Sequence, residues 1–122
     1  MSRMAISVAR IGVDMKYEKH DFDMAIQDYA DHLVGNYQRW AQSADAVGKY
    51  EVSFDKGRKF LKVVKTSWGS RGVHSFICIK EHDQWKYGDI LKAATWAQPA
   101  KNFARGNVLN TDSYKYMSWT GA

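Results

Sequence analysis

One apolar stripe constrains the fold of this chain more than any other feature of its sequence. Its six members are Phe22, Ile26, Tyr29, Leu33, Tyr37 and Trp40. They recur at steps of three and four residues, which places them on one face of an α-helix. Asp21 can cap the first turn, and Gly48 is a natural stop after the last one. We therefore expect a helical segment over residues 20–47, regular from about Asp21 to Ala44, whose stripe faces a core or a partner.

After this stripe the apolar period changes from 3.6 residues to two, which is typical of β-strands. Residues 50–54 alternate, the turn Asp55-Lys56-Gly57 follows, and residues 58–66 alternate again. Two further strands are expected over residues 73–79 and 85–96, with polar or glycine-rich turns between them. Residues 48–97 therefore predict a four-stranded antiparallel meander.

The ends of the chain complete the expected organisation. Pro99, the single proline, suits the first position of a short helix over residues 98–107, which Gly106 and Asn107 would end. Residues 108–122 are either a docked arm or a partner-binding extension, and residues 1–19 a strand or arm. Because 122 residues support one modest core, we predict a single α+β domain over residues 1–122. Its parts are an N-terminal amphipathic helix, a four-stranded meander sheet and a short C-terminal helix.

The positive charge of the chain is concentrated in its centre. The whole sequence carries a net charge of +5, and residues 49–71 alone hold seven basic against two acidic residues. Such a local excess is expected of a surface that meets polyanions, although a solvated face without a partner explains it too. The long helix is net acidic, which disfavours its insertion into the groove of a duplex.

Cations and aromatic rings share the predicted strands and turns, and this is the combination that binds single-stranded nucleic acid. The candidate phosphate contacts are Lys56, Arg58, Lys62, Lys65 and Arg71, and the candidate rings are Phe60, Trp68, His74 and Trp85. A second, weaker basic patch comprises Lys92, Lys101 and Arg105. In the competing interpretation Phe60 and Phe76 are core residues beneath the helix. The sequence leaves open which face of the sheet is exposed.

Catalytic chemistry has little support in the sequence. The four histidines are scattered, and no glycine-rich phosphate loop is present. Cys78 shares a predicted strand face with His74, but a buried strand cysteine is the simpler interpretation. A single cysteine allows no internal disulfide, and no apolar run is long enough to span a bilayer. We therefore expect a cytosolic protein without catalytic activity, metal or cofactor, and keep a small nuclease as a minor alternative.

The last third of the chain carries a recognisable motif. Gly88-Asp89-Ile90-Leu91-Lys92-Ala93-Ala94-Thr95-Trp96, then Pro99-Ala100-Lys101 and Ala104-Arg105-Gly106-Asn107, form a signature pattern. This pattern resembles Gly-Asp-x-x-Lys-x-Ala-Ser/Thr-Trp-x-x-Pro-Ala-Lys-x-x-Ala-Arg-Gly-Asn, found in a family of small tailed-bacteriophage proteins. The likeness extends over about residues 48–109. It implies a phage-encoded protein that acts in the cytoplasm of an infected bacterium.

The chain also resembles chimallin C, the RNA-binding protein of nucleus-forming jumbo phages, and the Whirly and Pur-type single-stranded nucleic-acid binders. This resemblance implies a ligand of single-stranded RNA or DNA, with RNA slightly favoured. The chain departs from the Whirly and Pur pattern because its long helix precedes the sheet. We also expect a homo-oligomer, since both predicted sheet faces carry apolar residues. The alternative function is an interaction module that binds and redirects a host or phage protein through exposed aromatic residues.

Overall fold

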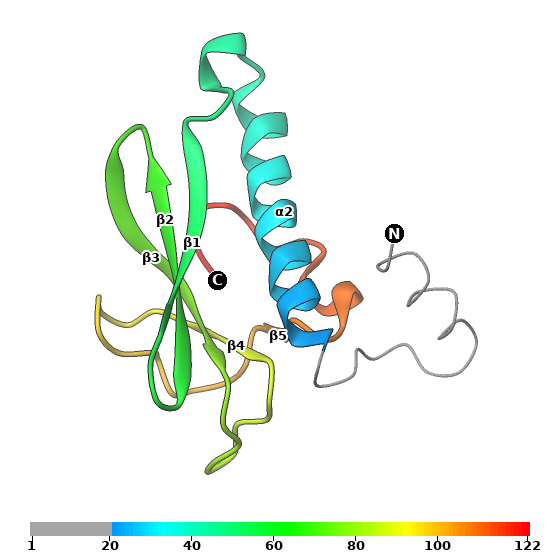
Figure 1. Ribbon diagram of the computed structural model, residues 1–122, viewed down its shortest axis with the longest axis vertical. Coiled ribbons are helices and arrows are strands. Elements are labelled where there is room, and N and C mark those ends of the chain that lie inside the picture. Colours follow the sequence, from blue (N-terminus) through cyan, green and yellow to red (C-terminus); the bar gives the residue numbers. More distant parts are fainter. Residues whose placement is uncertain (1–20) are drawn as a thin grey trace, which may run out of the picture.

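A single long helix lies across one face of an antiparallel sheet in this computed structural model, which describes residues 21–122 (Figure 1). The helix is α2 (Phe22–Ala41), and two short 3-10 helices are η2 (Ala44–Ala46) and η3 (Thr111–Tyr114). The strands are β1 (Tyr50–Lys56), β2 (Phe60–Ser67), β3 (Ser70–Cys78), β4 (Asp89–Lys92) and β5 (Gly106–Asn107). They pair in chain order. The α+β class and the meander are as predicted, and the arm expected over residues 1–19 lies outside the described residues.

The helical stripe forms one side of the main core, as its spacing predicts. Tyr29, Leu33 and Tyr37 are fully or almost fully buried, and each such side chain contributes roughly 1.5–3 kcal/mol by leaving water. Trp40 is the exception, because 65% of it is exposed. The helix ends before the predicted Ala44, since Gln42 adopts a left-handed conformation with a φ of 50°.

The prediction of a short helix over residues 98–107 is wrong, and the sheet has five strands where four were predicted. Pro99 pairs with Ala93 in an isolated bridge, and the amide of Ala100 donates to the carbonyl of Lys92 over 2.7 Å. The amide of Arg105 likewise donates to the carbonyl of Ile90. The open edge of β4 therefore takes the hydrogen bonds that a helix would have used internally, and a proline is tolerated there because the strand is at an edge.

Residues of the signature motif fix the junction between β4 and β5. The Asn107 side chain donates to the carbonyl of Tyr87 and to Oδ1 of Asp89, both over 3.0 Å, and accepts from the amide of Leu109. Gly88 has a φ of +91°, and a Cβ there would lie 2.6 Å from Oδ1 of Asn107. Both the backbone angle and the space at this position require glycine. This part of the signature therefore has a structural role.

A register shift in β3 changes which side chains face the helix. Val63 pairs with Ser75 and Val64 with Val73, which leaves His74 without a partner on β2. Such a β-bulge reverses the alternation of the side chains that follow. His74 and Ser75 therefore both reach Tyr29 on the helix side. The prediction that His74 and Cys78 share one strand face is wrong for this reason.

The two faces of the sheet support two separate apolar clusters. The larger one lies beneath α2 and includes Leu61, Val63 and Ile77. The smaller one, on the opposite face, contains Phe76, Cys78, Trp85 and Leu91, with Phe60 partly buried against it. Phe60 and Phe76 are therefore not beneath the helix, and they lie on the sheet face that α2 does not cover.

The C-terminal residues form a docked arm, which resolves the alternatives for residues 108–122. Tyr114 is buried, and the Tyr50 hydroxyl donates to the carbonyl of Trp119 over 2.7 Å. The amide of Trp119 donates to Oδ1 of Asn36 on the helix. The arm thus contacts both α2 and the sheet, and the amide of the last residue, Ala122, donates to the carbonyl of His74 on β3.

Candidate nucleic-acid interface

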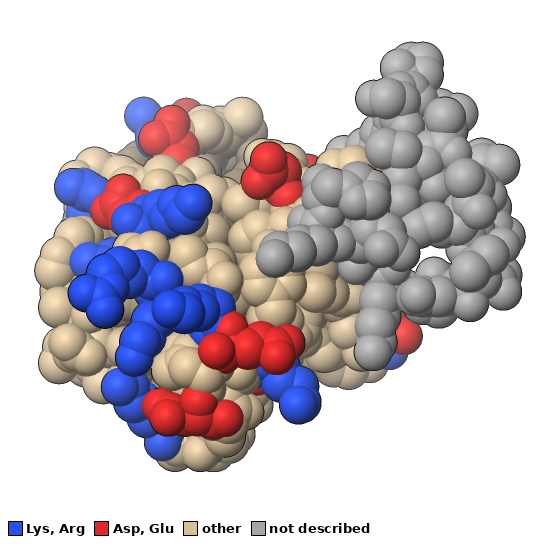
Figure 2. Space-filling view, turned by 60° about the horizontal axis from the view of Figure 1, so that its bottom comes forward, with Lys and Arg blue, Asp and Glu red and all other residues tan. Residues whose placement is uncertain are grey.

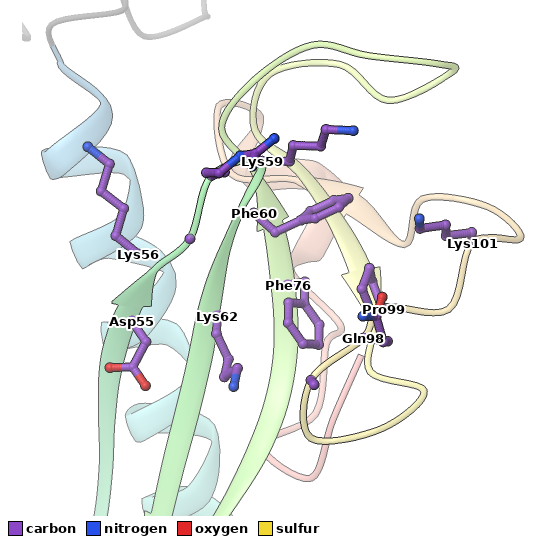
Figure 3. A pocket seen from close by; sticks show the side chains of 12 residues that line it. Asp55, Lys56, Lys59, Phe60, Lys62, Phe76, Gln98, Pro99 and Lys101 are labelled. Atoms are coloured by element: carbon purple, nitrogen blue, oxygen red, sulfur yellow. The ribbon is translucent and has the colours of Figure 1, made fainter.

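A groove of about 460 Å³ opens on the sheet face that α2 leaves uncovered (Figure 3). One wall comes from the β1–β2 hairpin and the other from the segment after Trp96. The lining residues are Asp55, Lys56, Gly57, Arg58, Lys59, Phe60, Lys62, Phe76, Ala97, Gln98, Pro99 and Lys101. We call this hollow the basic groove.

The tight hairpin explains why so many cations surround the basic groove. The amide of Gly57 donates to the carbonyl of Phe60 over 2.9 Å, and a Cβ on Gly57 would lie only 2.9 Å from the same oxygen. A glycine therefore allows the close turn. Lys56, Arg58 and Lys59 occupy the exposed turn positions around it. Their ammonium and guanidinium groups stay in water, as the burial cost of a charge requires.

The electrostatic character of the basic groove is strongly positive. Its lining contains five basic residues and one acidic residue, Asp55, which leaves four net positive charges. Figure 2 shows Lys and Arg side chains gathered on one side of the molecule, with some Asp and Glu among them. A concave surface with one dominant sign concentrates ions of the opposite sign and speeds their association.

Aromatic rings form the floor of the basic groove. Phe60 and Phe76 contact each other edge to face, with 6.3 Å between ring centroids. Phe76 is buried, whereas Phe60 is only partly buried and its ring borders the groove, as Figure 3 shows. Phe60 therefore offers a surface on which a flat, apolar group can pack.

Trp96 is a functional candidate that the sequence reasoning missed. The residue is 49% exposed, and Nζ of Lys62 and Cζ of Arg71 lie 4.3 Å and 5.5 Å from the centroid of its ring. The prediction placed Trp96 at the end of the fourth strand, whereas β4 ends at Lys92. Its position just ahead of Gln98-Pro99 was the available signal, because such a sequence favours an exposed turn.

Five of the predicted binding residues meet in the basic groove: Lys56, Arg58, Phe60, Lys62 and Lys101. Lys59, which was not among the predicted contacts, joins them. Arg71 lies beside the groove against Trp96, and Lys92 is exposed on β4 outside it. The predicted second patch of Lys92, Lys101 and Arg105 is therefore divided, because Lys101 belongs to the groove. Arg105 instead packs on Phe103, with 4.1 Å from Cζ to the ring centroid.

Three predicted contacts are corrected by the structure. Trp85 is buried in the smaller apolar cluster, so its ring cannot stack on a base. His74 is buried on the sheet face that α2 covers, where its Nε2 lies 2.8 Å from the carbonyl of Ser118. Lys65 is on that same side, and its ammonium donates to the carbonyl of Thr120. Partial burial lowers the pKa of Lys65.

Trp68 is exposed, as predicted, but it lies at the opposite end of β2 from the basic groove. It occupies the turn to β3 with a φ of 54°, and Gly69 follows with a φ of 83°. A tryptophan in this left-handed conformation is unusual. Its ring nitrogen donates to the hydroxyl of Tyr37, and Nζ of Lys49 lies 5.5 Å from the ring.

Residues 21–122 offer few groups suited to metal binding or catalysis. No cluster of three or more His, Cys, Asp or Glu side chains there could hold a metal ion. The Cys78 thiol is buried, and burial raises its pKa. No helix in the described part of the chain is long and apolar enough to cross a membrane.

Comparison with known proteins identifies the family of the chain and adds no described activity. No curated protein and no solved structure matches the sequence. A family model described as a family of unknown function, DUF7717, matches residues 13–122 and therefore covers both the sheet and the basic groove. Because this match spans most of the chain, the protein belongs to the DUF7717 family.

Proposed function

We propose that this protein binds single-stranded nucleic acid in the basic groove without catalysing a reaction, with RNA slightly preferred to DNA. The observation that supports this most is the meeting of five cations with the partly exposed ring of Phe60 in one concave site. Cations contact phosphates, and rings accept unpaired bases with about 1–3 kcal/mol per stacked base.

A single strand suits this site better than a duplex. Bases must be unstacked and turned outward to reach the floor at Phe60 and Phe76, which only unpaired nucleotides allow at low cost. The long helix α2 carries Asp23, Asp28 and Asp31 against Arg39, so it would be repelled from the phosphates that line a duplex groove.

The wider biological setting is part of this proposal. The signature motif supports a phage-encoded protein in the bacterial cytoplasm, and the resemblance to chimallin C and to Whirly and Pur-type proteins supports the same ligand class. We propose that copies of the chain associate, because β1 is a seven-residue edge strand of the described sheet. Light scattering coupled to size-exclusion chromatography measures this directly, and a monomer at all concentrations would contradict it.

The proposed function is tested by removing two groove cations. The Arg58→Ala, Lys62→Ala variant is expected to bind a fluorescein-labelled single-stranded RNA about 10-fold to 100-fold more weakly at moderate salt. The slope of log affinity against log salt concentration should fall by about 1.4, because each single-strand phosphate contact contributes about 0.7. Fluorescence anisotropy at several salt concentrations measures both quantities, with single-stranded DNA and duplex as further probes.

A matched control distinguishes the groove from general positive charge. The Lys86→Ala, Lys115→Ala variant removes two charges from exposed residues that do not line the groove. It should retain affinity within about 3-fold. Equal losses in the two variants would contradict a defined site, and unchanged affinity in the groove variant would exclude the proposal.

One specific observation supports the alternative function, an interaction module that binds a host or phage protein. Trp40, Val47 and Trp68 are each more than half exposed near the end of α2, and large exposed apolar side chains often mark protein contacts. The docked arm is unsuitable for the test, since Val108 and Tyr114 are buried and its deletion would damage the core. The Trp40→Ala, Val47→Ala variant should lose a bound host protein in pull-downs from bacterial lysate while oligonucleotide affinity is kept. Retention of that host protein would exclude this surface.

A further inference from the structure

Trp96 separates the basic groove from a second hollow on the same side of the protein. The second hollow has a volume of about 340 Å³ and is lined by Val73, Ala93, Ala94, Thr95 and Trp96. The basic groove begins with the very next residues, Ala97, Gln98 and Pro99. Both volumes fall in the range of about 300–1,000 Å³ that is usual for small-molecule sites. Two neighbouring hollows thus share one boundary, which is the turn that carries Trp96.

The turn that carries Trp96 is held firmly in place. Oγ1 of Thr95 accepts from the amides of Ala97 and Gln98 over 3.2 and 3.0 Å. The carbonyl of Gln98 in turn accepts from the amides of Ala94 and Thr95. Pro99 is buried and pairs with Ala93 across the base of the turn. A ring on so constrained a backbone loses little freedom when a ligand packs against it.

The surroundings of the Trp96 ring suit a charged, flat ligand. About half of the side chain is exposed, although Lys62 and Arg71 both approach the ring. A cation over an exposed ring is held weakly compared with a stacked base. The flexible Lys62 side chain can therefore leave the ring for a phosphate when a base arrives. The side chains that line the second hollow are uncharged and mostly apolar, so the hollow suits a base better than a phosphate.

We infer that Trp96 packs between two successive nucleotides of a single strand. One nucleotide lies in the basic groove, and the next places its base beside Val73 and Ala93, with the linking phosphate facing Lys62 and Arg71. The smallest ligand that fills the complete site is therefore a dinucleotide. This inference rests on the proposed function and adds to it the unit of nucleic acid that the protein recognises.

The test separates stacking from charge by using two probes. One is a labelled single-stranded oligonucleotide, and the other is an oligomer of the same length and charge that lacks its bases. Trp96→Leu should weaken binding of the oligonucleotide about 5-fold to 100-fold and leave binding of the abasic oligomer within about 2-fold. Trp96→Phe should restore most of the lost affinity. Trp40→Leu, at an exposed tryptophan near the end of α2, should change neither value.

Competition by short ligands tests the size of the site. A dinucleotide with a 5′ phosphate should displace the labelled strand from the native protein at least about 10-fold better than a mononucleotide with the same charge. Trp96→Leu should abolish most of that difference. Thermal melting of the variant confirms that it remains folded.

The outcomes distinguish the inference from the proposed function. If Trp96→Leu lowers the affinity for both oligomers equally, or for neither, stacking at Trp96 is excluded while single-strand binding by the groove stands. If the native protein binds the abasic oligomer as tightly as the oligonucleotide, base stacking is excluded as well. If the native protein binds neither oligomer, the proposed function fails and the inference fails with it.

Discussion

Asn107→Ala is expected to lower the free energy of unfolding by about 2–4 kcal/mol, because its side chain makes three hydrogen bonds that join the start of β4 to the end of β5. The amide group donates to Tyr87 and Asp89, and the amide oxygen accepts from Leu109. Alanine would leave all three partners without this hydrogen bond in a partly buried place, at about 1 kcal/mol or more for each. Urea denaturation followed by circular dichroism measures the loss. For a chain of this size the melting temperature should fall by roughly 10 °C.

Two further variants test the origin of this effect. Asn107→Asp keeps an acceptor for Leu109 but replaces the donor by a carboxylate oxygen that faces Asp89, so it should be at least as destabilising at neutral pH. Asn102→Ala is the matched control, because that exposed side chain only accepts from the adjacent amide of Phe103. A loss below about 1 kcal/mol for Asn107→Ala would show that the β4–β5 junction does not depend on this residue.

Acidification from pH 7 to pH 4 is expected to lower the free energy of unfolding by about 3 kcal/mol through His74 alone. The pKa of His74 falls from its usual 6.5 to about 4, mainly because of burial; the bond to Ser118 opposes the shift, and the nearby Lys65 and His32 add to it. Because Nε2 faces the Ser118 carbonyl, we infer that Nδ1 is unprotonated and accepts from the Ser75 hydroxyl, 2.9 Å away.

The sign of this effect follows from the direction of the shift. Above pH 6.5 the imidazole of His74 is neutral in both the folded and the unfolded chain, and its contribution to stability is complete. Between pH 6.5 and pH 4 the unfolded chain takes up the proton first, so stability falls as the pH falls. Below pH 4 both forms are protonated, and the loss from this residue no longer grows.

His74→Gln isolates this contribution from that of the carboxylates. Glutamine can donate to the Ser118 carbonyl without titrating, so the variant should lose less stability than the native protein between pH 7 and pH 4. Urea denaturation at steps of half a pH unit provides the comparison. Parallel pH curves for the native protein and His74→Gln would show that His74 does not titrate as inferred.

Much of the fold could be predicted because it depends on local periodicity. The helical stripe predicted α2, and the alternating segments predicted the order of the strands and their antiparallel pairing. The segment around Pro99 failed, because a proline suits the first turn of a helix and an edge strand equally well. The edge of β4 decided between the two, because it accepts hydrogen bonds from the amides of Ala100 and Arg105. No local sequence pattern predicts these bonds.

The candidate site was predicted in part for a similar reason. Arg58, Phe60 and Lys62 follow one another along one hairpin, so the sequence already placed them together. Trp85 was assigned to the surface, but the second apolar cluster buries it. Trp96 and Lys101 reach the site only because the chain after β4 folds back over the uncovered sheet face.

The sequence by itself determined the secondary structure up to β4 and the concentration of charge on the β1–β2 hairpin, since both are properties of neighbouring residues. Only the tertiary structure decided which face of the sheet is free, because that depends on where α2 and the C-terminal arm pack. It also decided that His74 is buried, because the bulge at Val63 and Val64 reverses the alternation that the sequence shows. Packing between distant segments, which no short window of sequence contains, is the physical reason for both.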